Sequence, residues 1–176
     1  MENKPSTFTL CLGYGAIIAL AIIVYNLILF LLNLGQNTAL NYVAYVILLG
    51  GILLAQFNYR NKYMGGFISY GNAFTIGFIT SIVLAVIIGV YTFVFFKYIA
   101  PGAMEEGMAI AEQKLMDKGM SDAEIEQGMA VARKFAGPGM ATFIAVLSNI
   151  FLGLIISLLT ALAVKKEDTG FGQPVA

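Results

Sequence analysis

The chain has 176 residues, of which 59% are hydrophobic and 11% are charged. Soluble domains carry about a quarter charged residues, and a chain of this size has too little interior to remove so much apolar surface from water, so we predict a membrane protein. Ten basic residues balance ten acidic ones, which gives no reason to expect a nucleic-acid partner. The absence of histidine and the single cysteine, Cys11, exclude a Ser-His-Asp triad, an internal disulfide and a cysteine-rich metal site.

Four long apolar segments are predicted to be transmembrane helices. They cover about 8–34, 39–57, 73–96 and 140–164, and none of them contains a charged residue. A hydrocarbon core about 30 Å thick needs roughly 20 helical residues, and a helix satisfies all its own backbone groups in lipid. The first segment is longer than the ~7–15 apolar residues of a signal-peptide core, so we expect it to be retained.

The links between these segments suggest an orientation. Residues 35–38 form a short uncharged turn, whereas 58–72 contains Arg60 and Lys62 and no acidic residue. Four spans place both termini on one side of the membrane, and cytoplasmic links are enriched in Lys and Arg. The two sides tie at five basic residues each, but those on the terminal side lie closer to the helix ends, which favours cytoplasmic termini. These five are Lys4, Arg60, Lys62, Lys165 and Lys166, the last two in the 165–176 tail.

The polar insertion at 101–139 is predicted to lie on the periplasmic side and to contain a helical hairpin over 103–136. Apolar residues recur at helical spacing on both sides of Gly119, and Ser121 with Glu124 matches a capping box. In one interpretation, the two apolar stripes pack on each other or on the membrane surface. In the other, they form a docking face for a protein partner. The stripe residues for the partner face are Met104, Met108, Leu115, Ile125, Met129 and Phe135.

Rows of small residues at four-residue spacing predict close helix packing, because they let helix backbones approach in lipid. In the third segment the row includes Gly77, Ser81, Ala85 and Gly89, and in the fourth it includes Ala145, Asn149, Gly153 and Ser157. We expect the two helices to pack near 81–85 and 149–153. Packing within one chain is favoured over a homo-oligomer, which is the alternative.

The polar residues inside the predicted spans are neutral. They include Asn26, Thr80, Ser81, Asn149 and Ser157. Such residues commonly bond their own helix or a neighbouring one, so we interpret them as packing residues. The acidic residues do not follow calcium-loop spacing, and the sequence offers no catalytic residue, metal site or cofactor site. We therefore do not expect an enzyme.

Residues 59–74 combine aromatic and basic residues with Gly65-Gly66 and the stretch Phe67-Ile68-Ser69-Tyr70-Gly71. With the tight first hairpin, the long loop after the third span and the lysine-rich tail, this segment resembles the bacterial membrane family known as domain of unknown function 4199, over roughly 5–166. The resemblance implies a four-span protein of the bacterial inner membrane. It implies no activity, ligand or catalytic residue.

The predicted fold is all-α: an integral membrane bundle of four transmembrane helices with an extramembrane amphipathic helical hairpin between the third and fourth, in one domain over 1–176. The predicted function is a non-enzymatic structural or accessory role in the cell envelope, with a protein partner bound by the hairpin. The alternative is a small transporter or channel subunit that acts as an oligomer, with a path lined by Thr80, Ser81 and Asn149.

Overall fold

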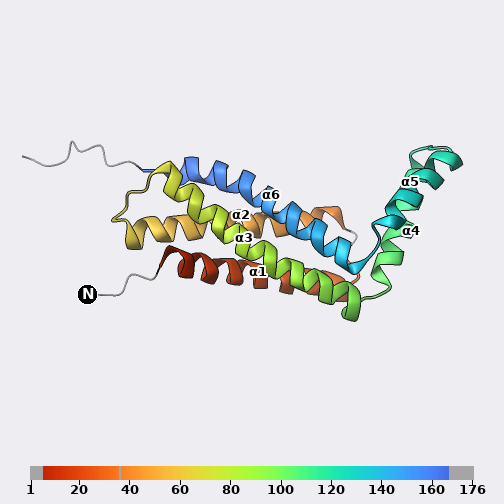
Figure 1. Cartoon of the computed structure of the whole chain (residues 1–176), viewed down its shortest axis with the longest axis horizontal. Coiled ribbons are helices and arrows are strands. Elements are labelled where there is room, and N and C mark those ends of the chain that lie inside the picture. Colours follow the sequence, from red (N-terminus) through yellow and green to blue (C-terminus); the bar gives the residue numbers. More distant parts are fainter. Residues whose placement is uncertain (1–5, 36, 167–176) are drawn as a thin grey trace, which may run out of the picture. The chain divides into compact units, whose positions relative to one another are not determined.

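The computed structural model describes residues 6–35 and 37–166, and this part of the chain is all-helical, with no β-strand (Figure 1). Four helices are long and apolar enough to cross a membrane, judged by length and composition. Two shorter helices lie between the third and the last of them. The elements are α1 (Thr7–Leu31), α2 (Thr38–Tyr63), α3 (Tyr70–Val94) with a π-helical turn at Phe95–Ile99, α4 (Ala103–Asp117), α5 (Asp122–Lys134) and α6 (Pro138–Val164).

Capping residues decide where the long helices begin. The Ser6 hydroxyl accepts a hydrogen bond from the Thr9 amide at 3.2 Å, and the Asn37 side chain accepts one from the Ala39 amide at 3.0 Å. These side chains satisfy amides that a helix leaves unpaired in its first turn. Pro138 occupies the first position of α6, where its missing N–H costs nothing.

α2 ends at Tyr63 rather than near residue 57, which corrects the position predicted for two basic residues. Arg60 and Lys62 lie in the last turn of this helix and not in a loop. Positive charge is favourable there because the terminal carbonyls carry partial negative charge. The remaining link contains Gly65 and Gly66 at φ values of 62° and 90°, which glycine adopts without strain.

The described chain forms two compact units, one made of residues up to Ile87 with those from Ser148 onward, the other made of Ile88–Leu147. In the first unit α3 is the central helix. It contacts α1 where Gly15 meets Val83, and it contacts α2 through a hydrogen bond from the Gln56 amide group. It contacts α6 where Ser81 meets Gly153, so every other long helix packs on α3.

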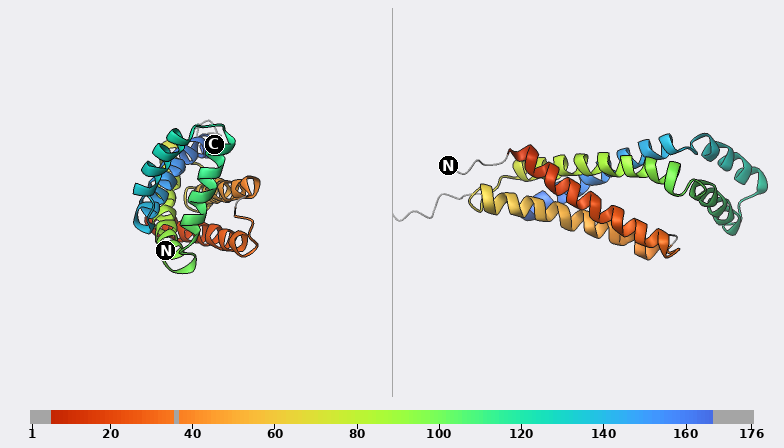
Figure 2. Two further views of the ribbon diagram at one scale, coloured as in Figure 1. Left: turned by 90° about the vertical axis from the view of Figure 1, so that its right-hand side faces the viewer. Right: turned by 90° about the horizontal axis from the view of Figure 1, so that it is seen from below.

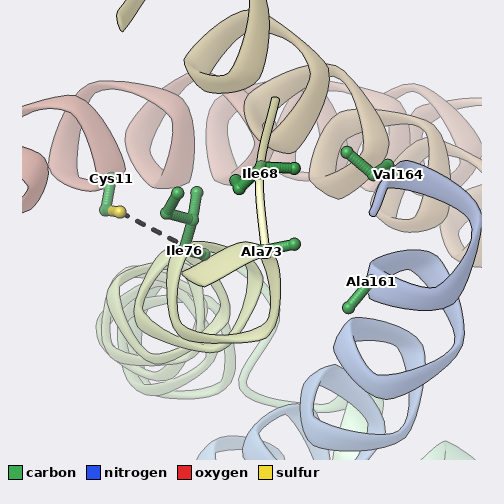
Figure 3. Packing of buried hydrophobic residues seen from close by; sticks show 6 residues of the cluster. All are labelled: Cys11, Ile68, Ala73, Ile76, Ala161 and Val164. Atoms are coloured by element: carbon green, nitrogen blue, oxygen red, sulfur yellow. Dashed lines mark hydrogen bonds between the residues drawn. The ribbon is translucent and has the colours of Figure 1, made fainter. Parts of the chain in front are cut away.

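The apolar core of the first unit gathers side chains from distant parts of the chain (Figure 3). Its buried members are Cys11, Ile68, Ala73, Ile76, Ala161 and Val164. The Cys11 thiol donates to the Ile76 carbonyl at 3.6 Å, so it packs as a core residue. Ile68 also exchanges two backbone hydrogen bonds with Lys166, at 2.9 and 3.0 Å, which joins the start of α3 to the end of α6.

In the second unit α4 and α5 pack side by side (Figure 2). The turn between them places Gly119 at φ 74°, a left-handed conformation that suits the end of a helix. The capping box predicted at the start of α5 is present, since the Glu124 carboxylate accepts from the Ser121 amide and hydroxyl at 2.9 and 2.7 Å. Ile125 and Met129 are buried in this unit.

Candidate functional site

A buried polar cluster lies where α2, α3 and α6 meet. The Gln56 side chain is fully buried, and its Nε2 donates to the Ala73 carbonyl at 3.0 Å. A Cβ on Gly77 would lie 2.5 Å from Gln56 Nε2 and 2.8 Å from Ser157 Oγ. Both polar groups therefore occupy space that only a glycine leaves open.

One turn further along α3, the cluster continues into the contact between Ser81 and Gly153. A Cβ on Gly153 would lie 2.3 Å from Ser81 Cβ and 2.6 Å from Ser81 Oγ. The Ser81 hydroxyl donates to the Gly77 carbonyl at 2.8 Å. The structure thus brings together four of the residues predicted for helix packing: Gly77, Ser81, Gly153 and Ser157.

Three buried polar atoms have no hydrogen-bond partner among the described residues: Gln56 Oε1 and Ser157 Oγ in this cluster, and Thr80 Oγ1 on the part of α3 that meets α1. A buried polar atom left unpaired costs about 1–3 kcal/mol, so their presence in an apolar core is unusual. The cluster contains neutral donors and acceptors only. It can hydrogen-bond a small polar group, but it contains no side chain suited to acid–base chemistry at neutral pH.

Gln56 is the residue of this cluster that the sequence analysis missed. It is the only glutamine inside the four predicted spans, and that isolation was the available signal. Gln56 lies inside the span predicted at 39–57, one residue before its end, but it was not among the polar residues considered there. Its side chain faces α3, where it donates a hydrogen bond to the Ala73 carbonyl.

The other residues predicted for helix packing do not share this contact. Ala85 is buried on α3, whereas Ala145 and Asn149 are half-buried on α6. Gly89 lies in the second unit, where a Cβ added to it would lie 2.3 Å from Val146 Cγ2. The row of small residues therefore serves several contacts along α3 rather than one.

The predicted partner face divides between buried and exposed residues. Ile125 and Met129 are buried, so they are not accessible to a partner in this conformation. The remaining members are more accessible: Met104, Met108 and Leu115 are half-buried, and Phe135 is 52% exposed. The burial of Ile125 and Met129 inside the α4–α5 pair matches the interpretation in which the apolar stripes pack on each other.

The basic residues of the first unit gather around the Ile68–Lys166 pairing. Arg60 Nη1 donates to the Val164 carbonyl at 3.1 Å, and the Arg60 guanidinium lies 4.7 Å from the centre of the Phe57 ring. The Lys166 ammonium lies 5.4 Å from the centre of the Phe67 ring. Lys62 and Lys165 are exposed, whereas Lys4 and residues 167–176 of the tail lie outside the described residues.

Titratable and metal-binding chemistry is sparse in the part of the chain that the structure describes. Its Cys, Asp and Glu side chains form no group of three or more that could hold a metal ion. Hydrogen bonds from the Ser121 hydroxyl and amide lower the pKa of the Glu124 carboxyl below its ordinary value. That effect belongs to the capping of α5 and marks no reactive site.

Comparison with known proteins identifies a family but no function. No curated protein and no solved structure matches the chain. The family model described as "Protein of unknown function (DUF4199)" matches residues 13–166, which is most of the chain. The protein therefore belongs to the DUF4199 family.

Proposed function

We propose that the protein is a multi-pass protein of the bacterial inner membrane with a non-enzymatic structural or accessory role in the envelope. The observation that carries the membrane assignment is the apolar outer surface of the long helices. Leu31, Val46 and Ile17 are 75%, 67% and 66% exposed, and each belongs to a helix long enough to span a bilayer. Such a surface is stable against lipid and unfavourable against water.

The α4–α5 pair is proposed to be an amphipathic hairpin outside the hydrocarbon region. These helices have 15 and 13 residues, fewer than the ~20 needed to span it. They also carry charged residues, including Glu105, Glu112, Lys114 and Glu126. Charged side chains are costly at the centre of a bilayer, so the pair is better placed in the periplasm than within the bundle.

Both termini are proposed to be cytoplasmic. The hydrogen bond from Arg60 to Val164 and the pairing of Ile68 with Lys166 gather basic residues at one end of the first unit. No acidic residue occurs between residues 3 and 104 of the sequence, so Arg60 and Lys62 have no acidic neighbour in sequence, and positive charge close to helix ends is typical of the cytoplasmic side. It is the end expected to face the cytoplasm.

Cysteine labelling in intact spheroplasts tests this orientation. In a Cys11→Ser background, Ser121→Cys should react with a membrane-impermeant reagent, because α5 begins on the periplasmic side. The matched variant Asn61→Cys, also at an exposed position, should react only after lysis. Protection of position 121 together with labelling of position 61 in intact cells would reverse the orientation.

The hairpin is proposed to bind a protein partner through the apolar residues that remain exposed on α5 and at its end. Val131 and Phe135 are 51% and 52% exposed, and their four-residue spacing places them on one side of the chain. A photo-crosslinking amino acid at position 135 should capture a second protein in native membranes. The same probe at the exposed polar position Gln127 is the control, and equal capture at both positions would contradict a defined docking face.

A second candidate function, a small transporter or channel subunit acting as an oligomer, is favoured by the unpaired Gln56 Oε1, Thr80 Oγ1 and Ser157 Oγ. Polar atoms of this kind could line a path for a small solute if the helices separate. Purified protein in liposomes would then support solute flux, and Gln56→Met would abolish the flux while leaving the fold intact. Absence of flux from correctly inserted wild-type protein would reject this candidate.

A further inference from the structure

A groove between α1 and α2 is lined by apolar residues on one side and by polar and basic residues on the other. Its volume is ≈ 330 Å³, within the range of roughly 300–1,000 Å³ that ligand sites occupy. Leu10, Gly13 and Ile17 of α1 form the apolar side. Asn58, Lys62 and Tyr63 of α2 line the other side. The groove lies entirely within the first unit.

The polar side of the groove has hydrogen-bond donors and a positive charge. Asn58 Nδ2 donates to the Tyr14 hydroxyl, and this contact ties the two helices together at the side of the groove. Lys62 is exposed and extends from the last turn of α2. An ammonium group with amide and hydroxyl groups nearby is a suitable environment for a phosphate group.

Lys62 has no acidic partner within the described part of the first unit. The described residues of the first unit contain no acidic side chain, and the nearest acids in sequence are Glu2 and Glu167-Asp168, which lie outside the described residues. A free phosphate would contact the polar side of the groove and leave its apolar side uncovered. An amphiphile with an anionic head group would cover the apolar side with its chain and contact the polar side with its head group.

We propose that the α1–α2 groove is a binding site for an anionic phospholipid, with an acyl chain along Leu10, Gly13 and Ile17 and the phosphate held by Lys62. This inference rests on the proposed membrane location. A basic side chain at the end of a spanning helix lies at the depth of lipid head groups, and basic pockets between helices bind anionic lipids. The lipid would cover apolar surface that the protein itself leaves open.

The test measures lipid retained by the full-length protein. Protein is reconstituted in phosphatidylcholine vesicles with a minor fraction of phosphatidylglycerol, then extracted in mild detergent at one fixed, low ionic strength for all variants, because salt screens exposed charges such as that of Lys62. Mass spectrometry of the purified complex should show phosphatidylglycerol enriched over its share of the vesicle. The Lys62→Gln variant should lower the enrichment about fivefold, the ratio equivalent to the ~1 kcal/mol contributed by one basic residue near anionic lipid.

Matched variants separate the groove from other surfaces. A Cβ on Gly13 meets nothing within 4 Å, so Gly13→Leu fits the folded protein and fills the groove, which should reduce phosphatidylglycerol to its share of the vesicle. A Cβ on Gly50 of α2 also meets nothing within 4 Å and lies outside the groove, so Gly50→Leu should retain the lipid. Lys165→Gln, the same charge change outside the groove, should retain it as well.

Two outcomes would overturn the inference. One is undiminished enrichment in Gly13→Leu, and the other is an equal loss in the Lys62→Gln and Lys165→Gln variants. Flotation of the vesicles beforehand reports insertion separately. Protein that fails to float with the vesicles contradicts the proposed membrane location, whereas protein that floats without enriched phosphatidylglycerol contradicts the lipid site alone.

Discussion

Replacing Gly153 by alanine adds one methyl group at the contact between α3 and α6. The new Cβ would lie 2.3 Å from Ser81 Cβ and 2.6 Å from Ser81 Oγ. Carbon atoms in contact prefer about 3.5–4.0 Å, so one of the two helices must shift. The obstacle is a fully buried side chain that is hydrogen-bonded to its own helix, and it cannot rotate away without losing that bond.

The expected cost follows from two opposing terms. Overpacking a close contact destabilises by about 1–3 kcal/mol, whereas glycine to alanine inside a helix gains up to ~1 kcal/mol in helix propensity. The control Gly50→Ala carries the propensity term alone, because a Cβ at that position meets nothing within 4 Å. Gly153→Ala should therefore be less stable than Gly50→Ala by about 1–3 kcal/mol.

A double-mutant cycle with Ser81→Gly identifies the source of that cost. Removing the Ser81 side chain leaves its Cα as the nearest atom, 3.6 Å from the added Cβ, which is an ordinary contact. Gly153→Ala should then cost nothing in the Ser81→Gly background, so the two substitutions should be coupled by about 1–3 kcal/mol. The assay is reversible unfolding in mixed micelles with increasing dodecyl sulfate, followed by circular dichroism.

Two results would refute this reasoning. If Gly153→Ala unfolds at the same dodecyl sulfate fraction as Gly50→Ala, the backbones of α3 and α6 are not in close contact. If the destabilisation persists in full with Ser81→Gly, the close contact involves a different residue. Either result would remove the central feature of the polar cluster.

Two further predictions concern Gln56 and the start of α5. Gln56→Met should change the free energy of unfolding by less than ~1 kcal/mol, because losing the hydrogen bond to the Ala73 carbonyl is offset by removing the unpaired Oε1; a loss above ~2 kcal/mol in the same assay would show that this oxygen is paired. Because hydrogen bonds from Ser121 lower the pKa of Glu124, the capping contribution should be present above the ordinary value of 4.5 and should disappear as pH falls through the lowered pKa. The Ser121 amide chemical shift should titrate with a midpoint below 4.5 and should lose this titration in Glu124→Gln; a midpoint at or above 4.5 would contradict the capping role.

The apolar helices were predictable from the sequence because each is a long run of residues that contains no charged side chain. The run predicted at 8–34 corresponds to α1 at Thr7–Leu31, with its start decided by the Ser6 cap. The capping box at Ser121 was equally readable, since its two residues are close in sequence. Features that depend on neighbouring residues of the chain can be inferred before the fold is known.

The orientation of each helix about its axis was not predictable to the same extent. A helix that is apolar on all sides shows no inward face in its sequence, so nothing marked Gln56 as facing α3. The contact of Arg60 with the Val164 carbonyl joins residues that are remote in sequence, so no local pattern indicates it. The stripe containing Ile125 and Met129 could cover α4 or a partner, and only packing distinguishes the two.

The backbone pairing of Ile68 with Lys166 also has a consequence for biosynthesis. Ribosomes release α3 long before Lys166 exists, so the amide and carbonyl of Ile68 have no native partner while α4, α5 and α6 are being made. The turn itself has local hydrogen bonds, from the Gly66 amide to the Arg60 carbonyl and from the Phe67 amide to the Met64 carbonyl, and these can form as soon as the segment is made. The pairing that joins it to the end of α6 can form only after the last helix has been translated, so a nascent chain arrested within α6 would expose the backbone of Ile68.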